Sequence, residues 1–473
     1  MTIIRGVKTL DYPGKSAFNK FIVFLPALLA FTLALIPTIK YNWPLSWDIY
    51  YHIHNMKLYS EGILFWDSLT AAPYGRPIFY PPLFHLFLLS IVKILNISPF
   101  LAARLIQPFL AFFGVFSFSY ISRKFYGNII GFLTGLFIIS SPLFQRMIVP
   151  IPESMAVILL PLLVYFYYLA IKKGENKYAI VAGFLWGLVL LTHLLSALII
   201  LSVITVTTIL LKIKGEKNLK GYWIIIIAGL ITSSPWLIPL LIKYGFVFRS
   251  PPTQALPLKS YIQLIGPIPF FLALVGLINI LWDREKKNII ILSWFISVTF
   301  ISVIYIFGVN VITERIIYFN LFPVAVLASL SIKALNFEKK KYTLLLLMIM
   351  VLSLYNGYVT ANSTKPSISA SEIQVAEWFK YHGDHERVVV TADYHLDPII
   401  VSISDQPVAA GGYAPGTVKS INGDKYISGN FTKEEMIREK IGYIVLKTNM
   451  NPPPYSRLVY TNKDFKIYEG LIK

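Results

Sequence analysis

Residues 21–54 read FIVFLPALLAFTLALIPTIKYNWPLSWDIYYHIH, and the change of character within this stretch indicates the fold. The first part is almost entirely apolar and has the length of about 20 residues that a helix needs to cross a bilayer. The part that follows is rich in Trp and Tyr, which are enriched at the membrane surface. It also carries Asp48. We therefore predict a spanning helix whose end presents this carboxylate at the surface, where it can hold a metal ion or accept a proton.

The rest of the chain repeats this apolar character. Of 473 residues, 56% are hydrophobic and 15% aromatic, and the mean hydropathy is +0.63, so most of the chain cannot be a soluble globule. Spanning segments should be helical, because unpaired backbone amides are too costly in hydrocarbon. We predict an α-helical polytopic membrane protein with eleven transmembrane helices, at 21–40, 103–121, 128–147, 155–171, 178–192, 194–211, 222–242, 263–282, 289–308, 316–334 and 342–360.

One division in this set decides the topology of all that follows it. The apolar run 178–211 is too long for one span and somewhat short for two. We divide it at Thr192 and His193. Left undivided, it would move every later loop to the opposite side of the membrane.

Lys and Arg indicate the orientation, because short cytoplasmic loops retain positive charge. With Arg5, Lys8, Lys15 and Lys20 inside, alternation through eleven spans places every basic loop inside as well: Arg123–Lys124, Lys172–Lys173, Lys212–Lys220, Arg284–Lys287 and Lys339–Lys341. This requires that Phe84–Leu95, which is short and contains Lys93, lies at the membrane interface within the first outer loop, 41–102. The N-terminus is then cytoplasmic and the C-terminal part extracytoplasmic.

Charge and cysteine content exclude other classes of function. The formal net charge is +19, but the basic residues are spread over the cytoplasmic loops and do not form a soluble basic face, so nucleic acid is not an expected partner. The chain has no Cys, which excludes disulfides, thiol catalysis and Cys-based metal sites.

The chain from residue 361 onward differs in kind from the apolar part. Residues 388–390 and 441–446 are typical of short buried strands, and 370–381 and 433–440 of amphipathic helices, with Gly411–Gly412 and Pro415–Gly416 as turns. We predict a membrane domain at 1–360 and a small extracytoplasmic α/β domain at 361–473. Three Asn-x-Ser/Thr triplets, at Asn96, Asn362 and Asn430, all fall on the outer side in this topology.

Acidic residues are few in the membrane part, and their positions suggest a site. An acid at the edge of hydrocarbon is costly unless it is paired, hydrated or bound to a cation. Of the eleven acids before residue 361, five fall outside the predicted cytoplasmic segments: Asp48, Glu61, Asp67, Glu153 and Glu314. Asp48, Glu153 and Glu314 lie near helix ends on one face and could converge on Mg²⁺ or Mn²⁺. They could instead cap helices, and Glu314 could pair with Arg315.

Cations and rings on the same face could bind a substrate. The outer arginines are Arg76, Arg104, Arg146, Arg249 and Arg315. Arg offers paired donors to phosphate, and Arg315, at a helix entrance, is the best placed for this role. The alternative for the others is contact with lipid headgroups. Aromatic rings of the first outer loop could anchor the interface or stack on a sugar. His52, His54 and His85 could serve a metal, a proton or the structure, and His193 is expected to be a hydrogen-bonded buried histidine.

These motifs resemble the GT-C glycosyltransferases, membrane enzymes that use polyprenyl-phosphate or polyprenyl-pyrophosphate sugars. Within this superfamily the chain is most similar to the archaeal and eukaryotic oligosaccharyltransferase catalytic subunits. The motifs that carry the resemblance are Asp48-Ile49-Tyr50-Tyr51-His52, Gly75-Arg76-Pro77, Tyr80-Pro81-Pro82-Leu83-Phe84-His85, Arg146 with Glu153, and Thr313-Glu314-Arg315-Ile316-Ile317-Tyr318. The resemblance is clearest over the first 160 residues or so and around Glu314.

The resemblance implies roles for particular residues. Asp48, Glu153 and Glu314 would be the catalytic carboxylates and the ligands of a divalent metal, and Arg315 would contact the donor phosphate. The implied substrate-binding residues are Arg315, Arg146, Arg76, Tyr51, His52, His85, Tyr80, Asp393 and Tyr394. It also implies an archaeal plasma membrane as the location.

The outer domain departs from the oligosaccharyltransferase pattern. Those enzymes carry Trp-Trp-Asp-Tyr-Gly to grip the acceptor, whereas residues 391–395 here read TADYH. Asp393 and Tyr394 match, but both tryptophans and the glycine are missing. We therefore expect a metal-assisted, inverting transfer of a sugar from a polyprenyl (dolichyl) phosphate to a hydroxyl of a lipid, glycan or protein. The alternatives are transfer of a lipid-linked glycan to Asn of a protein and, in a different class, a transporter or flippase.

Overall fold

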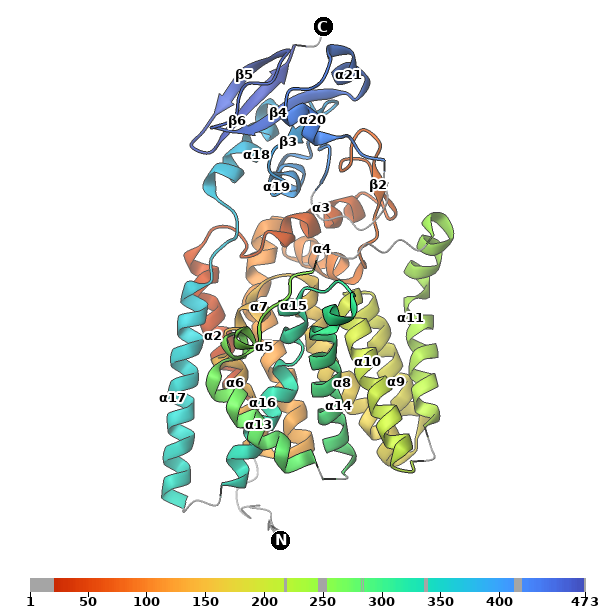
Figure 1. Ribbon diagram of the computed structural model, residues 1–473, viewed down its shortest axis with the longest axis vertical. Helices are drawn as coiled ribbons and strands as arrows, with labels where there is room; N and C mark the ends of the chain where they lie inside the picture. Colours follow the sequence, from red (N-terminus) through yellow and green to blue (C-terminus); the bar gives the residue numbers. More distant parts are fainter. Residues whose placement is uncertain are drawn as a thin grey trace.

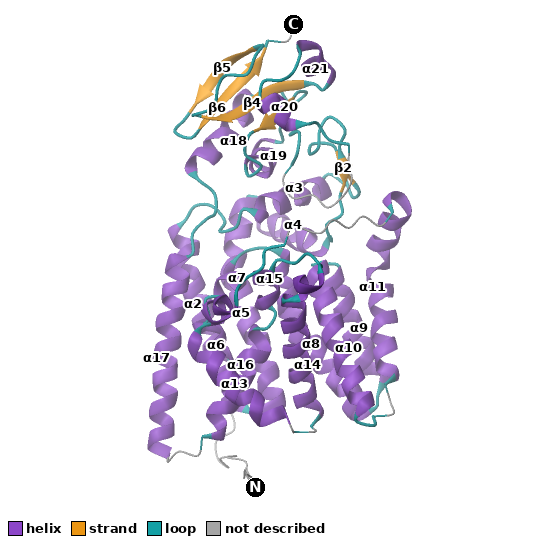
Figure 2. Cartoon of the chain, viewed as in Figure 1, coloured by secondary structure: helices purple, strands orange, loops and turns teal. Residues whose placement is uncertain are grey.

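The protein consists of a long helical bundle with a small α/β domain at one end (Figures 1 and 2). The computed structural model describes residues 21–216, 219–245, 253–281, 283, 285–335, 339–411 and 419–471. Within the first part the helices are α2 (Phe24–Lys40), α3 (Asp48–Ser60), α4 (Leu83–Leu95), α5 (Pro99–Tyr126), α6 (Asn128–Ser140), α7 (Phe144–Ile148), α8 (Pro152–Lys173), α9 (Asn176–Leu190), α10 (Leu194–Ile213), α11 (Lys220–Tyr244), α12 (Leu258–Ile265), α13 (Pro267–Leu281), α14 (Lys286–Ser302), the 3₁₀ helix η1 (Ile304–Phe307), α15 (Thr313–Tyr318), α16 (Leu321–Ala334) and α17 (Lys339–Ser363).

The long helices begin and end where the sequence has capping residues. The Ser98 side chain accepts a hydrogen bond from the Leu101 amide at the start of α5, and Pro99 fills the first helical position. α8 begins with Pro152 and stops at Gly174, whose positive φ of 72° suits glycine. The predicted division at Thr192 and His193 is confirmed, because α9 ends just before this pair and α10 begins just after it.

Each predicted span coincides with helical structure, but several are not single straight helices. The segment predicted at 263–282 contains a bend of 104° between α12 and α13, where Gly266 has a positive φ and Pro267 follows. The segments predicted at 128–147, 289–308 and 316–334 are interrupted as well, at 141–143, 303 and 319–320. The prediction of continuous spans is wrong there, because apolar composition alone does not indicate where the helical backbone is interrupted.

By length and apolar character, five of the described helices can cross a membrane, or six if the bent pair counts as one span. Several others have only 13–17 residues. At 1.5 Å per residue such helices are about 20–25 Å long, less than the roughly 30 Å of bilayer hydrocarbon. The number of eleven crossings therefore stays a prediction.

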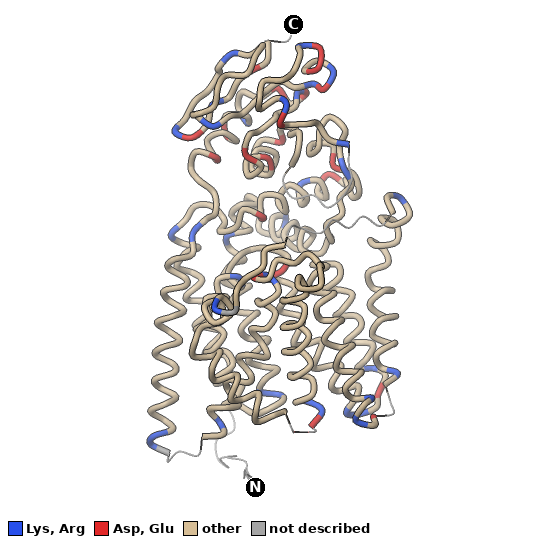
Figure 3. Tube along the Cα trace, viewed as in Figure 1, with Lys and Arg blue, Asp and Glu red and all other residues tan. Residues whose placement is uncertain are grey.

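Basic residues gather at the end of the bundle that lies away from the α/β domain (Figure 3). Lys and Arg occupy the last turns of α5, α8 and α10, and α14 and α17 begin with Lys at the same end (Figure 1). The basic N-terminal residues and Arg284 lie outside the described residues. The separation of charge agrees with the predicted alternation, and the assignment of this end to the cytoplasm stays a prediction.

The C-terminal domain contains more structure than the sequence indicates. Its elements are α18 (Ala370–His382), β3 (Val388–Thr391), α19 (Leu396–Ser404), α20 (Gly423–Ile427), α21 (Lys433–Arg438), β4 (Ile441–Lys447), β5 (Ser456–Thr461) and β6 (Phe465–Gly470). The sheet order is β3-β4-β6-β5, with β3 and β4 parallel and the other pairs antiparallel. The two predicted strands and the two predicted helices are present, and α21 ends two residues early. Gly412 and the predicted Pro415–Gly416 turn lie outside the described residues.

The first outer loop and the C-terminal domain share backbone hydrogen bonds and an apolar core. A short two-stranded sheet in the loop, β1 (Trp66–Asp67) with β2 (Arg76–Pro77), lies next to residues 408–411. The backbone amides of Ala71 and Ala72 donate to the carbonyls of Ala410 and Val408, and Val408 donates back to Leu69. A common apolar core contains side chains of α3, α4, α5, α18, α19 and β4. This packing fixes the domain over the end of the bundle that carries Asp48.

Candidate active site

Asp48 is the first residue of α3, on the face of the bundle that the C-terminal domain covers. Its amide donates a hydrogen bond to Ser46 Oγ at 3.2 Å. Its carboxylate interacts electrostatically with Arg315, Arg146, Glu153 and His395. Burial raises the pKa of this carboxyl above its usual range, although both arginines act in the opposite direction. Asp48 is thus partly buried and lies among charged groups, which together with Glu314 we call the pocket of acids.

Glu153 is held by Arg146 across the turn between α7 and α8. The two side chains form an ion pair, with Arg146 Nη2 2.5 Å from Glu153 Oε2. Ser154 Oγ donates to the Arg146 carbonyl at 2.7 Å and fixes the turn. The guanidinium also lies over the Tyr318 ring, 5.4 Å from its centroid. Glu153 is therefore fully buried but charge-compensated, which is the condition for an ionised acid in such a place.

Glu314 and Arg315 come from α15, far along the chain. The Thr313 amide donates to the Gln254 carbonyl, and its hydroxyl donates to the Ser302 carbonyl at 3.1 Å, which orients the short helix. Arg146 Nη1 lies 3.8 Å from Glu314 Oε1. Arg315 interacts with both Asp48 and Glu153. The structure therefore brings the three predicted acids and the two arginines together, from α3, α7, α8 and α15.

The acids are arranged differently from the predicted metal site. Within the described ranges, no group of three or more His, Asp or Glu side chains could hold a metal ion. Glu314 is half exposed and faces Arg146, so the predicted set of three carboxylate ligands is not assembled. Mg²⁺ is, however, commonly bound by one or two carboxylates together with substrate phosphates. Glu153 Oε1 is buried without a hydrogen-bond partner, and its charge interacts with that of Asp48. These two residues fit a divalent cation.

His52 and His85 lie behind the pocket, in contact with each other. His52 Nδ1 is 3.0 Å from His85 Nε2, and the exposed fractions of the two residues are 3% and 0%. Burial, with the charges of His85 and His193, lowers the pKa of His52 far below its usual range, so its ring is neutral. Rings of Tyr80 and Phe84 cover them. Both rings are thus largely covered and support the packing of Tyr80, and their predicted contact with substrate stays a prediction.

Arg76 is buried between the first outer loop and the C-terminal domain. Its Nη2 donates to the Gly411 carbonyl at 3.2 Å, its Nε lies 3.9 Å from Asp67 Oδ2, and its guanidinium lies over the Tyr51 ring. Only 3% of the residue is exposed. Asp67, which also contacts His54 at 3.0 Å, holds the loop together. Arg76 thus joins the first outer loop to the C-terminal domain. The predicted substrate-binding roles of Arg76 and Tyr51 stay predictions.

Arg104, another outer arginine, has a structural contact away from the acids. Arg104 Nη2 donates to the Thr38 carbonyl at 2.9 Å and so links α5 to α2. Arg249 lies outside the described residues.

Two further groups at the site were not predicted. His193 interacts electrostatically with Glu153, and its ring lies 6.5 Å from that of Tyr80. Its Nδ1 accepts from the Ser196 amide, so the expected hydrogen-bonded histidine is confirmed, but it borders the pocket. The second group is His395, which follows the predicted Asp393 and Tyr394 and reaches Asp48 from the outer domain. In the sequence, His193 could have been noticed because the polar pair Thr192–His193 interrupts the apolar run 178–211. No local sequence pattern points to His395.

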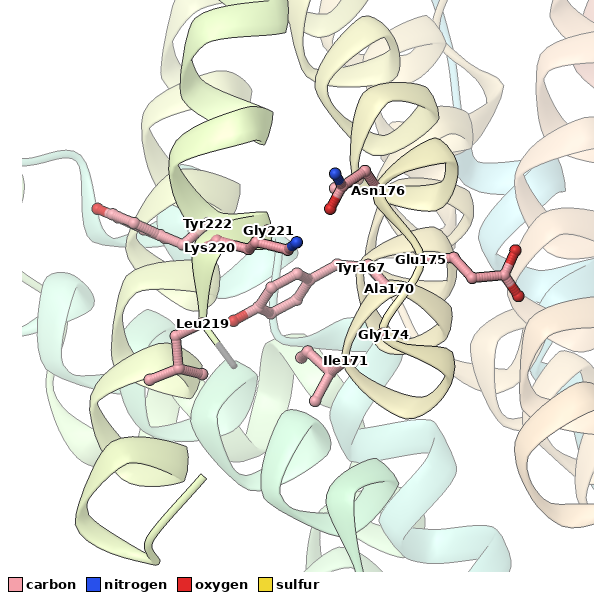
Figure 4. A pocket seen from close by; sticks show the side chains of 11 residues that line it. Tyr167, Ala170, Ile171, Gly174, Glu175, Asn176, Leu219, Lys220, Gly221 and Tyr222 are labelled. Atoms are coloured by element: carbon pink, nitrogen blue, oxygen red, sulfur yellow. The ribbon is translucent and has the colours of Figure 1, made fainter. Parts of the chain in front are cut away.

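The cavity shown in Figure 4 lies elsewhere. It is lined by residues at the C-terminal end of α8, the start of α9 and the start of α11, among them Tyr167, Glu175 and Tyr222. Glu153 is at the opposite end of α8. This cavity therefore belongs to the basic end of the bundle and takes no part in the pocket of acids.

Comparison with known proteins supports the assignment of the fold. Residues 80–238 match the family model described as dolichyl-phosphate-mannose-protein mannosyltransferase. The archaeal oligosaccharyltransferase AglB from Archaeoglobus fulgidus, solved with an inhibitory peptide and a dolichol-phosphate, superimposes with a TM-score of 0.69 at 13% identity, over 91% of this chain and 69% of that one. This chain has the GT-C fold.

Two other GT-C structures agree over nearly the whole length. ArnT from Cupriavidus metallidurans, bound to undecaprenyl phosphate, gives a TM-score of 0.62 at 11% identity and covers 96% of this chain and 98% of that one. Arabinofuranosyltransferase AftD from Mycobacteria gives 0.64 at 12% identity, over 96% of this chain and 42% of that one. The sequence matches no curated protein at a significant level. At these identities the GT-C likeness describes the fold, and the reaction has to be argued from the pocket.

Proposed function

We propose that this protein is a membrane glycosyltransferase that moves a sugar from a polyprenyl (dolichyl) phosphate to a hydroxyl acceptor. The observation that carries the proposal is the meeting of Asp48 and Glu153 with Arg146 and Arg315 at the end of an apolar bundle. Such a pocket offers both anionic groups for a proton and cationic groups for a phosphate. It lies where a lipid tail could remain among the helices while its head group reaches the charges.

The lipid-phosphate part of the proposal is supported by chemistry and by the comparisons. Guanidinium groups bind phosphate through paired, charge-assisted hydrogen bonds. Arg146 is already engaged by Glu153, whereas among the described residues no hydrogen bond or ion pair is found for the side chain of the partly exposed Arg315. Arg315 is therefore the better candidate for the donor phosphate. The structures of AglB and ArnT contain a dolichol-phosphate and undecaprenyl phosphate, respectively.

The proposed reaction is a single inverting displacement. The acceptor oxygen attacks C1 of the donor sugar from the side opposite the phosphate, and the C1–O bond to phosphate breaks with its electron pair left on the phosphate oxygen. Arg315 stabilises this developing charge. The acceptor proton passes to the carboxylate of Asp48, whose burial makes it a better base than an exposed Asp. Arg146 keeps Glu153 ionised beside it.

A divalent cation such as Mg²⁺ or Mn²⁺, held by Asp48 and Glu153, would add positive charge beside the donor phosphate. Glu314 then has a separate role. It is half exposed and lies within reach of Arg146 Nη1, so it helps to orient the guanidinium whose Nη2 pairs with Glu153.

A second candidate is transfer of a glycan to an Asn side chain. The likeness to AglB favours it, as does the presence of Asp393 and Tyr394 near the pocket. Against it, residues 391–395 lack the paired tryptophans. The same pocket of charges could serve either acceptor, since both reactions release a lipid phosphate.

Transfer assays with the purified protein test the proposal. The protein in lipid nanodiscs is given radiolabelled polyprenyl-phosphate sugars with peptide, lipid or oligosaccharide acceptors, and the products are identified by mass spectrometry. The proposal predicts labelled product with a hydroxyl acceptor and a large loss of product with Arg315→Ala. Product on Asn alone would favour the second candidate, and label that stays on the lipid with every donor and acceptor would contradict both.

A further inference from the structure

Three Asn-x-Ser/Thr triplets, at Asn96, Asn362 and Asn430, have no part in the proposed reaction. Such a triplet is the acceptor sequence for an N-linked glycan where the chain is exported and the asparagine is accessible. The structure separates the three by position. Asn96 follows the end of α4, Asn362 lies in the last turn of α17, and Asn430 lies between α20 and α21. The surroundings of each asparagine decide whether it can carry a glycan.

Asn430 lies in a tight turn that presents its side chain to solvent. Gly429, just before it, has a left-handed φ of 79°, and the backbone amide of Asn430 donates to the Lys425 carbonyl at 2.9 Å. Asn430 is exposed, and no hydrogen bond is found for its side-chain amide among the described residues. The turn is thus held by its backbone, and the side-chain nitrogen is accessible for a bond to a sugar.

The other two residues of this triplet fix the turn. Phe431 is 7% exposed, and its ring packs on that of Tyr426 with centroids 4.8 Å apart. Thr432 is exposed and caps α21: its Oγ1 accepts from the Glu435 amide at 3.3 Å, and its own amide donates to Glu435 Oε2 at 3.0 Å. The side chains on either side of Phe431 therefore face outward, and a glycan on Asn430 displaces no packed side chain.

Asn430 also lies far from the membrane part of the chain. α20 and α21 belong to the half of the outer domain that lies away from the bundle (Figure 1). The surface beside the turn is charged, because Lys425 pairs with Glu435 and Arg438 lies next to them. A glycan on such a surface stays in water and lies away from the pocket of acids.

The other two triplets lie at the membrane part. Asn362 belongs to α17, which is long and apolar enough to cross a membrane. The Thr364 of its triplet is 1% exposed, and the Thr364 hydroxyl donates to a backbone carbonyl of α17. Asn96 directly follows Ile94 and Leu95, which are 80% and 55% exposed, as is typical of a helix that lies in the membrane interface. Neither asparagine is therefore well placed for a bulky, hydrated glycan.

We propose that Asn430 is the N-glycosylation site of this chain and that Asn96 and Asn362 stay unmodified. The donor is a lipid-linked oligosaccharide, and the enzyme is an oligosaccharyltransferase of the same membrane that acts on the chain during export. The amide nitrogen of Asn430 forms the bond to C1 of the donor sugar. The C1–O bond to the lipid phosphate breaks with its electron pair on the phosphate oxygen, and the amide proton passes to a base of that enzyme. The inference requires an extracytoplasmic outer domain but not the reaction proposed for the pocket of acids.

Translation of the full chain in the presence of endoplasmic-reticulum microsomes tests this inference, because the microsomes supply both the lipid-linked donor and the transferase. We expect the membrane-integrated wild type to migrate on a gel with the added mass of a single glycan, which endoglycosidase treatment removes. Asn430→Gln should abolish this shift, whereas Thr432→Ser, which keeps both the triplet and the helix cap, should retain it. The matched controls are Asn96→Gln and Asn362→Gln, which should leave the shift unchanged.

The outcomes separate this inference from the proposed function. Alkaline carbonate extraction identifies the chains that are integrated in the membrane, and only these are scored. An integrated wild-type chain without a glycan overturns the inference, as does a shift that survives Asn430→Gln or disappears with Asn96→Gln or Asn362→Gln. None of these results changes whether label leaves the lipid donor in the transfer assay. Conversely, a glycan on Asn430 supports the inference even if the purified protein transfers no sugar. Thermal melting of Asn430→Gln shows that it is folded.

Discussion

At the scale of single residues, the proposed chemistry depends most on Asp48. Its carboxylate interacts with Arg315, Arg146, Glu153 and His395 of the outer domain. Its position at the start of α3 places it between the bundle and the outer domain.

Replacement of Asp48 tests its role directly. Asp48→Asn keeps the size of the side chain but removes the base and the charge, so we expect turnover to fall by about 10² or more, the usual loss for a group that acts in the transition state. Initial rates with a radiolabelled lipid-linked sugar measure this. Glu61→Gln, which changes an exposed acid just beyond the other end of α3, is the control and should keep the wild-type rate. A fully active Asp48→Asn protein would remove Asp48 from the mechanism.

Asp397 leads to a prediction about pH. It is buried, accepts hydrogen bonds from Thr391 Oγ1 and the Gly411 amide, and burial raises its pKa to about 6. The folded state therefore binds this proton more tightly than the unfolded state, and stability from this group is lost as pH rises from about 4 through 6. The loss is on the order of 3 kcal/mol at most.

Melting temperatures of wild type and Asp397→Asn at pH 5 and pH 7.5 check this. Asn is neutral at both pH values and loses part of the hydrogen bonding. The melting temperature of the wild type should therefore exceed that of Asp397→Asn by a larger margin at pH 5 than at pH 7.5. An equal difference in melting temperature at pH 5 and pH 7.5 would contradict the raised pKa of Asp397.

The role of a residue could be predicted from the sequence where it depends on local sequence, but not where it depends on packing with distant residues. Asp48, Glu153 and Glu314 could be chosen because acids are rare near hydrocarbon and each follows or begins a helix on one face. His52, His85 and Arg76 belong to recognisable motifs, but their burial depends on packing with Tyr80, Phe84 and residue 411, which no local pattern contains. His395 was missed for the same reason.

At the scale of elements, the helices around the pocket are held by close packing of small residues. Gly276 of α13 lies against the backbone of α16, where an added Cβ would overlap the Leu327 carbonyl. α16 follows α15, which carries Glu314 and Arg315. Any displacement of α16 should therefore reach the pocket.

Gly276→Ala tests this packing. The backbone carbonyl of Leu327 cannot move aside as a flexible side chain would, so we expect a loss of stability of about 1–3 kcal/mol, typical of overpacking. Thermal unfolding in detergent measures it. Gly221→Ala on α11 is the matched control, because its Cβ would meet Ala179 and Ala170 at ordinary distances of 3.6 and 3.8 Å. Equal melting temperatures for the two variants would show that α13 and α16 are not tightly packed.

The prediction of elements succeeded where hydrophobic runs were long and failed where they were interrupted or short. α5, α8 and α10 have sustained apolar character and marked ends. α3 was missed as a helix because its residues are polar and aromatic and its stability comes from burial beneath α19. β5 and β6 were missed because neither reads as a buried run, and β6 is defined by its pairing with β4.

In the molecule as a whole, the proposed function requires the outer domain and the basic loops to lie on opposite sides of the membrane. The helix ends place the basic residues of α5, α8 and α10 far from the α/β domain. Composition could predict this separation. It could not predict that the first outer loop is shared with the outer domain, because that depends on backbone pairing between residues more than 330 apart.

Cysteine labelling tests the orientation, and the natural absence of Cys makes the background clean. We expect a membrane-impermeant maleimide to label Ser428→Cys in the outer domain of intact cells, and Lys214→Cys at the end of α10 only after permeabilisation. Both positions are exposed, so accessibility differs only by side. The reverse pattern would invert the topology and place the pocket on the cytoplasmic side.

The central claim is that residues from α3, α7, α8 and α15 form one pocket for a lipid-linked phosphate. A cryo-electron microscopy structure with bound polyprenyl phosphate tests it most directly. We expect the phosphate within hydrogen-bonding distance of Arg315, beside Asp48 and Glu153, with the lipid chain leaving between the helices. A phosphate bound at the basic end of the bundle, or outside the reach of these residues, would contradict it.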